Sequence, residues 1–355
     1  MGRVLLYLVC RVFGDTIGRD VTEIASHFLF GADLKINLEK TMRILISGGI
    51  GFIGSSLALA LSKLKNHVII IDRRDNNKGE KIYEKNNYIS FYRGDIRDRY
   101  FISSILEKES IDGIIHLAAI SRVIDAEKNP TDCLSINVEG YKSIIEKASL
   151  VSYKKPWIIF GSSREVYGSQ TLLPVTENVE KKYVNIYGKS KLQGEKLTKE
   201  YFNNNNVSAL ILRFSNVYGN KFDILDRVIP KFIISTFLEK PLVIEGGGQV
   251  IDFTHIDDTV ATIIKSIEYI SGNDKIFDDF HILPGKGKSL YELIEIIESV
   301  LGKKATIKVN NKRNYDVEKF IGDPSKRIKI LNKSKFLSLE EGIRKSIPNY
   351  LGDLK

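Results

Sequence analysis

The sequence predicts an α/β protein built on a doubly wound parallel sheet, with a smaller C-terminal α/β lobe. From Met42 onward, short apolar runs alternate with segments of helical periodicity, which is typical of parallel β-α-β units. The runs are wholly apolar, as strands are when helices cover both faces of their sheet. Because this regularity falls beyond about residue 220, we expect a sheet domain over residues 42–220 and the smaller lobe over residues 221–355.

The expected elements alternate along the sheet domain. Strands are expected at 43–47, 67–72, 88–95, 113–119, 157–163 and 208–219. Helices are expected at 52–65, 135–151 and 187–202. To the smaller lobe we assign helices near 224–238, 257–271 and 289–301, and the short strands "PLVIEG" and "ATIKV".

The first 41 residues stand apart from this pattern. The run "VLLYLVC" is apolar but short, is followed by Arg11, and has no small-residue cleavage site, so a signal peptide is not expected. The segment "MRILISGGIGFIGS" from Met42 reads as the start of a complete domain. We interpret residues 1–41 as a loose extension or start-site artefact, with an added docking or oligomerisation helix as the alternative.

The composition limits which classes of binding partner are expected. The formal net charge is +9, but the basic residues are spread along the chain and interleaved with acids. This favours a phosphorylated small molecule over nucleic acid as the partner. Cys10 and Cys133 are too few for a disulfide framework, which fits a reducing cytoplasm. No apolar segment approaches the roughly 20 residues that span a bilayer, so no membrane partner is expected.

A glycine-rich turn marks the expected cofactor site. "SGGIGFIG" places Gly48, Gly51 and Gly54 between the first strand and the first helix. Glycine permits the tight turn and lets the backbone approach a pyrophosphate, while the helix N-terminus offers N–H donors. The sheet is therefore expected to be of the Rossmann type and to bind a dinucleotide. The expected contacts of this turn are Gly48, Gly51, Phe52, Ile53 and Gly54.

An acidic residue at the end of the second strand favours NAD. Asp72 can accept both hydroxyls of the adenosine ribose and would repel a 2′-phosphate. Arg73 and Arg74 follow it, and a guanidinium there could instead bind the phosphate of NADP. We expect NAD, with Arg73 as a further cofactor contact.

A serine, a tyrosine and a lysine form the candidate catalytic group. "YGKSK" places Tyr187 and Lys191 four residues apart, hence on one face of a helix. A lysine cation near the phenol would lower the tyrosine pKa, so that the tyrosinate could take a proton from an alcohol while hydride leaves for NAD. Ser163, at the end of a neighbouring strand, could hydrogen-bond the same oxygen.

These motifs together resemble a known family. "GGIGFIG", "GDIRD", "HLAA", "SSREVYG", "YGKSK", "LRFSNVYG" and "GGGQVIDFTHIDD" occur in the order found in extended short-chain dehydrogenases/reductases, in the branch of nucleotide-sugar epimerases and dehydratases. The resemblance covers residues 42 to about 345. It implies that Ser163, Tyr187 and Lys191 are catalytic and that Asn216 contacts the sugar nucleotide. It also implies cofactor contacts at Asp95, Ile96, Ala118, Ala119 and Asn137.

The residues after Ser163 bear on the type of reaction. In the resembling 4,6-dehydratases, an Asp or Ser and then a Glu follow the catalytic hydroxyl and carry out the elimination. Here Arg164 takes the first of these places, and a guanidinium cannot cycle as an acid. We interpret Arg164 and Glu165 as paired with each other or with solvent at the rim, where Glu165 can contact substrate.

The substrate end departs from the family pattern. Ile251 stands where an arginine commonly pairs with the diphosphate, and Arg313 lies about where a second such arginine is expected. We therefore expect Arg313 to bind substrate phosphate. His255, close to Asp257 and Asp258, is interpreted as part of a helix cap, and no metal is assigned.

The sequence thus predicts an NAD-dependent enzyme that epimerises a nucleotide-diphosphate sugar at carbon 4, of the UDP-glucose/UDP-galactose type, with the smaller lobe mainly binding substrate. The alternatives are a 4,6-dehydratase, a 4-keto-sugar reductase, or a non-catalytic dinucleotide sensor or scaffold. The resemblance also suggests a homodimer formed through the helices near 98–108 and 134–152.

Overall fold

The computed structural model describes residues 41–74, 83, 85–333 and 335–352. All of them belong to one compact unit, Glu39–Lys355. The extension predicted over residues 1–41 lies, except for residue 41, outside the described residues.

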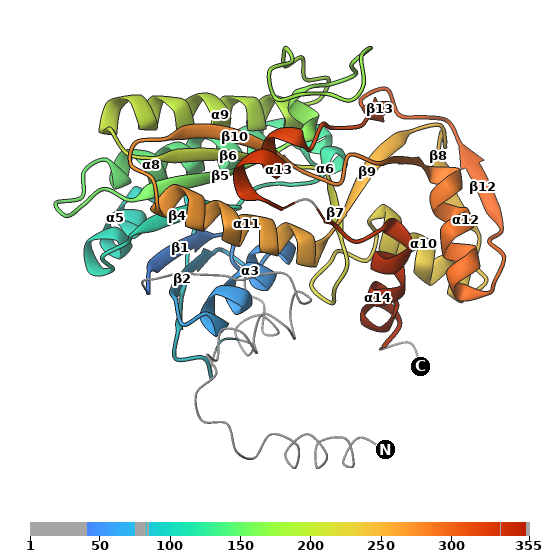
Figure 1. Ribbon diagram of the computed structural model, residues 1–355, viewed down its shortest axis with the longest axis horizontal. Helices are drawn as coiled ribbons and strands as arrows, with labels where there is room; N and C mark the ends of the chain where they lie inside the picture. The colour runs from blue at the N-terminus through green and yellow to red at the C-terminus, as the bar shows by residue number, and fades with distance from the viewer. Residues whose placement is uncertain (1–40, 75–82, 84, 334, 353–355) are drawn as a thin grey trace. The chain divides into compact units, whose positions relative to one another are not determined.

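The centre of this unit is a parallel sheet, which in the described residues has seven strands in the order β10-β6-β5-β4-β1-β2-β3 (Figure 1). Every adjacent pair is parallel, as predicted for a doubly wound fold. The strands are β1 (Arg43–Ser47), β2 (His67–Asp72), β3 (Ile89–Arg93), β4 (Gly113–His116), β5 (Trp157–Ser163), β6 (Ala209–Phe214) and β10 (Phe277–Ile282).

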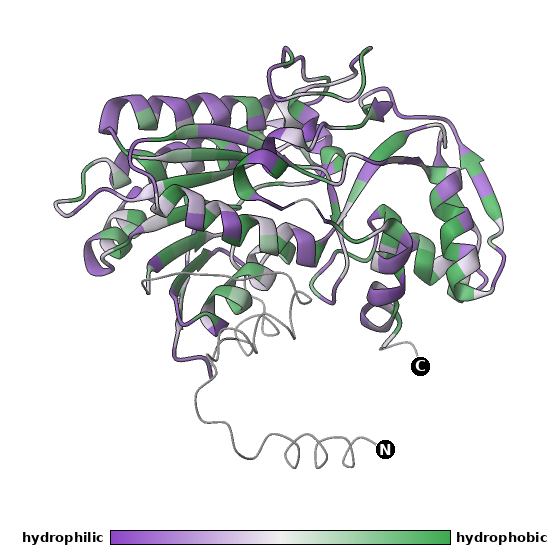
Figure 2. Ribbon diagram, viewed as in Figure 1, coloured by the Kyte–Doolittle hydropathy of each residue, from purple (hydrophilic) through white to green (hydrophobic). Residues whose placement is uncertain are grey.

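Helices cover both faces of the sheet. On one face α3 (Phe52–Lys63) packs against α11 (Ile256–Ser271). On the other, α5 (Arg99–Lys108), α8 (Tyr141–Ala148) and α9 (Ile186–Asn205) pack side by side. Figure 2 shows apolar strands between these layers and a mostly polar outer side of α9. The sheet therefore has the Rossmann-type arrangement that the sequence predicts.

Several boundaries differ from the predictions. The helix expected at 135–151 begins with a π-helical turn, Ser135–Gly140, before α8. The strand expected at 208–219 divides into β6 and β7 (Asn216–Tyr218), and β7 pairs with β9 (Val250–His255) outside the large sheet. The Ser215 hydroxyl donates to the Asp252 carbonyl at 2.5 Å, which ties the chain to β9 where it leaves the sheet.

The assignment of helix 257–271 to the smaller lobe is wrong. This segment is α11, which packs against α3 and β6 and thus covers the large sheet. The next strand, β10, was not predicted because Asp278 and Asp279 interrupt its apolar pattern. Both carboxylates pair with Lys326, so the strand reaches the sheet edge with its charges satisfied.

The smaller lobe has its own apolar core. Its helices α10 (Val228–Phe237), α12 (Leu290–Leu301) and α14 (Leu339–Leu351) pack together around buried Phe232, Leu293 and Ile343. Its strands are β8 (Leu242–Glu245), β9, β11 (Gly287–Ser289), β12 (Ile307–Asn310) and β13 (Lys319–Phe320). β9 pairs with β11, β13 and β7, whereas β8 pairs with β12. Short segments complete the described elements: α6 (Val123–Lys128), α7 (Pro130–Leu134), the 3₁₀ turn Arg164–Val166 and α13 (Ser325–Leu331).

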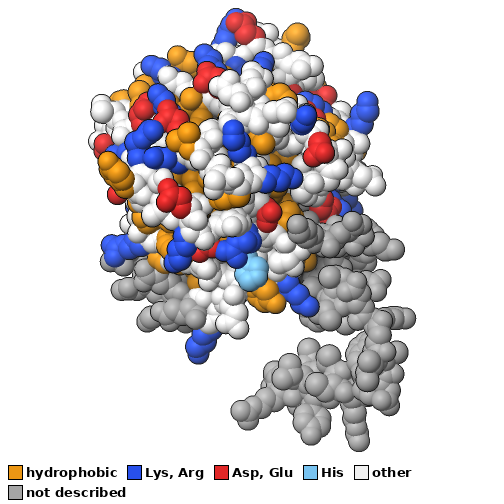
Figure 3. Space-filling view, turned by 90° about the vertical axis from the view of Figure 1, so that its left-hand side faces the viewer, with side chains coloured by type: hydrophobic (Ala, Val, Ile, Leu, Met, Phe, Trp, Pro, Cys, Tyr) orange, Lys and Arg blue, Asp and Glu red, His pale blue; other side chains and the backbone are white. Residues whose placement is uncertain are grey.

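The described surface carries charges of both signs. Figure 3 shows basic and acidic side chains interspersed over one face, with no single-sign patch among the described residues there. No helix within the described part of the chain is long and apolar enough to cross a membrane.

Candidate active site

A large cleft of about 1300 Å³ opens where the parallel strands end. Its walls include the segments that follow β1, β4, β5 and β6, and its far side is formed by α10, β8 and β9 of the smaller lobe. In open parallel sheets, ligands bind at this carboxyl edge.

The glycine turn forms the backbone cradle at one end of the cleft. Gly48 has a φ of +82°, and a Cβ there would lie 2.6 Å from the Ala118 nitrogen. A Cβ on Gly54 would lie 2.3 Å from the Gly48 carbonyl oxygen, so side chains are excluded from both positions. Gly51, Phe52 and Ile53 line the cleft where α3 begins. The open cradle and the helix N-terminus together fit a pyrophosphate.

Asp72 lies beside this cradle with both carboxylate oxygens engaged. Its Oδ2 accepts the Ile50 N–H at 3.1 Å, which holds the turn against the end of β2. The Arg74 side chain donates to the carboxylate twice, from Nε at 3.0 Å and from Nη2 at 2.8 Å, and its backbone N–H donates once at 3.1 Å. Arg73 lines the cleft as well, but the ion pair with Asp72 is made by Arg74.

The next part of the cleft holds all but one of the other residues predicted to contact cofactor. Asp95, Ile96, Ala118 and Ala119 line it. The Arg97 guanidinium donates to Asp95 and holds the pKa of this carboxyl below its usual value. Asn137 is not among the lining residues, and its side chain is used within the protein.

The amide of Asn137 holds the chain after β4 against α9. Its Oδ1 accepts the Ile120 N–H at 2.8 Å, and its Nδ2 donates to the Ser190 hydroxyl at 2.9 Å. The side chain is almost fully buried. The structure therefore gives Asn137 a supporting position behind the cleft wall, and its cofactor contact stays a prediction.

Ser163, Tyr187 and Lys191 come together in the cleft. Ser163 ends β5, while Tyr187 and Lys191 lie one turn apart in the first half of α9. All three are buried and line the cleft. The Lys191 ammonium donates to the Gly161 carbonyl at 2.7 Å and lies 5.8 Å from the centre of the Tyr187 ring.

Close approach of α9 to β5 brings these groups together. The Asn185 side chain caps α9 by accepting the Gly188 N–H at 2.7 Å. A Cβ on Gly188 would lie 2.5 Å from the Glu165 carbonyl oxygen, and one on Gly194 would lie 2.1 Å from the Phe160 ring. Glycine at these two positions lets the helix lie directly on the strand that carries Ser163.

The predicted lowering of the Tyr187 pKa by Lys191 is not found in the protein alone. Burial raises the pKa of Tyr187 to about 12, and the hydrogen bond with Ser163 acts in the opposite direction. Burial also lowers the pKa of Lys191 to about 8. Desolvation of the phenol is therefore the largest influence on its pKa, and the Lys191 ammonium donates to a carbonyl and not to the phenol.

Arg164 and Glu165 pair with each other, as interpreted, but inside the cleft wall and not at a solvent rim. Their exposed fractions are 8% and 6%, and Arg164 Nη2 lies 2.9 Å from Glu165 Oε1. Asn185 donates to the other carboxylate oxygen at 2.8 Å. Arg164 Nε donates to Asn216 Oδ1 at 3.2 Å, whereas its Nη1 has no partner among the described residues.

The lobe side of the cleft carries the remaining predicted residues. Arg313 lines it and donates from Nε to Asp316 at 2.9 Å. Ile251 is buried in the same wall and brings no charge. His255 caps α11 by accepting the Asp257 N–H at 3.2 Å, and burial lowers its pKa to about 4.

Sequence reasoning missed several cations of this wall. Arg122 and Arg227 line the cleft, and each contacts a residue next to the other in the sequence. Arg122 pairs with Asp226 at 2.8 Å, while Arg227 donates to the Ser121 hydroxyl at 3.2 Å. No local pattern marks these two arginines, since only the fold brings the loop after β4 beside the start of α10.

A buried polar network supports the wall from behind. Arg213 on β6 donates to both Glu195 oxygens, at 2.7 and 2.8 Å, and also contacts Tyr167 and Asp279. Ser162, next to Ser163, donates to Glu195 at 2.6 Å.

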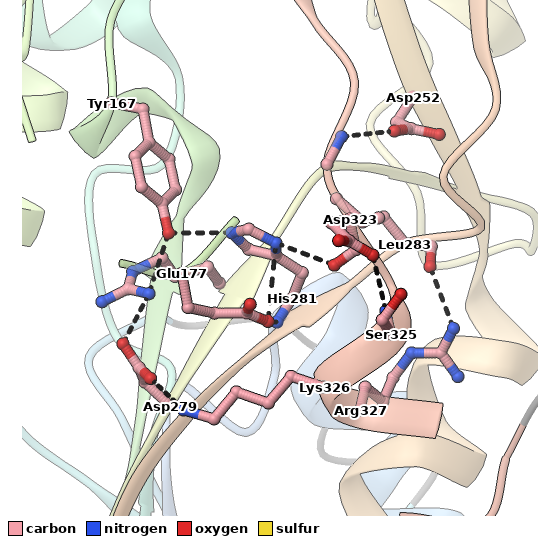
Figure 4. Close-up of polar contacts among 12 residues, drawn as sticks. Tyr167, Glu177, Asp252, Asp279, His281, Leu283, Asp323, Ser325, Lys326 and Arg327 are labelled. Atoms are coloured by element: carbon pink, nitrogen blue, oxygen red, sulfur yellow. Dashed lines mark hydrogen bonds and ion pairs between the residues drawn. The ribbon is translucent and has the colours of Figure 1, made fainter. Parts of the chain in front are cut away.

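Tyr167 extends this network to the C-terminal segments. Its hydroxyl lies 2.8 Å from His281 Nε2. Figure 4 shows the two side chains pointing toward each other. His281 Nδ1 lies 3.2 Å from the Asp323 carbonyl, which only accepts, so Nε2 is free to accept from the tyrosine. Burial lowers the His281 pKa to about 4, which keeps the ring neutral. The segment after β5 is thereby fixed to β6, β10 and the chain before α13.

A family model described as GDP-mannose 4,6 dehydratase matches residues 45–346, which include every residue that lines the cleft. The chain belongs to this family. Its members are the nucleotide-sugar epimerases and dehydratases among the short-chain dehydrogenases/reductases, as the motif order predicted.

Relatives within the family include epimerases. The chain is 27% identical over 306 residues to a UDP-glucose 4-epimerase of Lactobacillus helveticus, covering 82% of this chain and 91% of the relative. The Thermotoga maritima UDP-glucose 4-epimerase, solved with UDP-glucose, superposes with a TM-score of 0.81 at 25% identity, covering 88% of this chain and 100% of that one. The Bacillus cereus UDP-glucuronic acid 4-epimerase, solved with UDP-glucuronic acid and NAD, gives 0.80 at 28% identity, again with 88% and 100% covered.

Proposed function

We propose that the protein is an NAD-dependent epimerase that inverts carbon 4 of a nucleotide-diphosphate sugar, of the UDP-glucose/UDP-galactose type. The observation that carries this proposal is the meeting of Ser163, Tyr187 and Lys191 in one cleft with the glycine cradle. The family and its epimerase relatives support it.

The residues of the cradle fit the cofactor. Gly48, Gly51 and Gly54 leave room for the pyrophosphate, and Asp72 offers a carboxylate to the adenosine ribose. Arg74 occupies the Asp72 carboxylate in this structure. The ribose hydroxyls would therefore have to replace the Arg74 guanidinium as its hydrogen-bond partners. When bound in this cradle, NAD would supply the hydride acceptor and donor for carbon 4 of the sugar.

The protein moves the proton that accompanies this exchange. Tyr187 Oη, assisted by Ser163 Oγ, takes the proton of the 4-hydroxyl and later gives it back. Because burial raises the pKa of Tyr187 to about 12, the phenol is protonated at neutral pH in the protein alone. Positive charge beside it, from Lys191 and from the oxidised cofactor, would lower this pKa when the site is filled.

The remaining assignments are also proposals. Arg122, Arg227 and Arg313 form a cationic rim that suits the substrate diphosphate, and Asn216 contacts the sugar nucleotide. We propose that residues 42–220 mainly hold the cofactor and residues 221–355 mainly the substrate. A cytoplasmic homodimer through α5 and α8 remains a prediction, for which the 89% exposed Tyr100 of α5 is a suitable contact.

Two of the three rival functions, the dehydratase and the sensor, have less support from the site. A dehydratase needs a free acid and base after Ser163, but Arg164 and Glu165 bind each other there. A non-catalytic sensor has no use for a buried tyrosine and lysine beside a serine. A reductase shares the trio, and differs only in consuming external NADH or NADPH.

Proton NMR of the purified protein with UDP-glucose, without added reductant, separates these functions. The proposal predicts slow conversion to a UDP-glucose/UDP-galactose mixture. A 4-keto-6-deoxy product would indicate the dehydratase. A reductase would leave UDP-glucose unchanged and would consume NADH or NADPH only with a 4-keto sugar nucleotide.

A further inference from the structure

Glu165 is a carboxylate in the wall of the cleft with both of its oxygens occupied. Oε1 binds the Arg164 guanidinium at 2.9 Å, and Oε2 accepts from the Asn185 amide at 2.8 Å. The backbone N–H of Glu165 donates to the Ser163 hydroxyl at 3.2 Å. The carboxylate charge is close enough to Tyr187 to raise the pKa of the phenol.

A carboxylate in this place is a hazard for an epimerase. While carbon 4 is a ketone, the hydrogen on carbon 5 is adjacent to the carbonyl and is acidic. A free carboxylate within reach could remove it as a general base. Loss of this hydrogen would scramble carbon 5 or lead to elimination of the carbon 6 substituent.

We propose that Arg164, together with Asn185, holds Glu165 so that it does not act as a base on the 4-keto sugar. Arg164 is then the residue that restricts the reaction to inversion at carbon 4. This inference rests on the proposed function, because it needs the 4-keto intermediate. A guanidinium suits the task since it stays protonated and fixes the carboxylate in a charge-assisted hydrogen bond.

The step that Arg164 suppresses balances without any further reagent. A released Glu165 carboxylate takes the carbon 5 proton, and the electron pair of the C–H bond moves onto the carbon 4 oxygen as an enolate. In D₂O the solvent returns a deuteron to carbon 5, and the ketone is restored. Deuterium at carbon 5 therefore records how often Glu165 acts as a base.

The test uses the full-length protein with UDP-glucose in D₂O, with NMR signals of carbons 4 and 5 followed together. Wild type should invert carbon 4 and keep hydrogen at carbon 5. Arg164→Gln should raise the rate of exchange at carbon 5 by about a hundredfold, the usual contribution of a general base. Arg164→Ser, made in parallel, opens the same carboxylate if the glutamine variant does not fold.

Two further variants separate this role from a merely structural one. Arg164→Lys restores a cation and should return the exchange to the wild-type level. Arg164→Gln/Glu165→Gln removes the carboxylate and should also abolish the exchange. Inversion at carbon 4 by Arg164→Gln or Arg164→Ser with no exchange at carbon 5 would overturn the proposal. Exchange by wild type, or by the double variant, would do the same. Failure of wild type to invert carbon 4 would instead remove the proposed function, and this inference with it.

Discussion

Two buried arginines, Arg164 within the segment after β5 and Arg213 in contact with it, differ in how many of their guanidinium nitrogens have a partner in the protein. Each guanidinium nitrogen of Arg213 has at least one partner, among Glu195, Tyr167 and Asp279. Arg164 binds Glu165 and Asn216, but its Nη1 has no partner among the described residues. Arg213 lies behind the wall, whereas Arg164 lines the cleft.

This difference separates support from function. A buried charge is stable only when hydrogen bonds replace its lost hydration, and the Arg213 network meets that requirement from within the protein. The incomplete partnering of Arg164 suits a residue that faces a ligand. We therefore expect variants of the network to affect folding first, and variants of the cleft wall to affect the reaction first.

The largest effect is expected on the cleft side, at Tyr187. Tyr187→Phe removes the proton acceptor, so turnover should fall by roughly 10²–10⁴-fold, the range for general acid–base groups. Bound NAD, measured after denaturing the purified protein, should stay near the wild-type amount. Tyr183→Phe, at a half-exposed neighbour outside the cleft, is the matched control and should turn over normally. Normal turnover by Tyr187→Phe would remove this residue from the mechanism.

The network side is broken by Arg213→Met. Two carboxylates, Glu195 and Asp279, then lose their buried cation, so the free energy of unfolding should fall by about 3–5 kcal/mol. Urea denaturation measures this loss. Arg344→Met, whose side chain pairs with Glu340 on the surface, should change the stability by less than about 1 kcal/mol. Unchanged stability of Arg213→Met would contradict the supporting role of the network.

The pH dependence of stability tests the supporting role of the network at another of its residues, His281. Burial lowers its pKa to about 4, below the usual value near 6.5, so the unfolded chain binds a proton more readily. The neutral His281 therefore contributes fully to the free energy of unfolding above pH 6.5. This contribution is lost as the pH falls from 6.5 towards 4, and the loss is about 2 kcal/mol at pH 5. His255, with a pKa of about 4, adds a loss of the same sign. Burial raises the pKa of Asp252 to about 6, so the folded protein binds this proton more readily than the unfolded chain. Asp252 therefore adds stability as the pH falls and partly offsets the two losses.

Urea denaturation of wild type and His281→Gln at pH 8 and pH 5 isolates this contribution. The variant should be less stable at pH 8, yet lose about 2 kcal/mol less than wild type on acidification. Equal losses in the two proteins would show that His281 is not held neutral by the fold.

The smallest effect is expected at the rim of the cleft. Arg313→Ala removes one cation from the expected diphosphate site, so KM should rise about tenfold with little change in kcat. Lys312→Ala, which breaks only the exposed pair with Glu318, is the control and should leave KM unchanged. A large fall in kcat for Arg313→Ala would mean that this arginine acts in the transition state.

Local patterns in the sequence predict the motifs of the cleft and most strands of the large sheet. The glycine turn, Asp72 and the spacing of Tyr187 and Lys191 are short motifs, and most of the predicted strands of the sheet contain a continuous apolar run. These features needed no knowledge of distant contacts.

The buried polar contacts could not be predicted in this way, because they join segments that are distant in the sequence. Arg213 and His281 belong to neighbouring strands, so no pattern in either strand indicates that Tyr167 lies between them. The burial of Arg164 and Glu165 was missed because two adjacent charges usually indicate a solvent-exposed turn. The supporting role of Asn137 was missed as well, because the Ser190 hydroxyl that accepts from its amide lies on another helix.

The most direct test of the central claim follows deuterium placed at carbon 4 of UDP-glucose. If hydride leaves and returns within the cleft, UDP-galactose should form with the deuterium still on carbon 4, even when unlabelled NADH is present in the solution. Loss of the label to solvent, or its replacement by hydrogen from the added NADH, would contradict inversion through a retained cofactor.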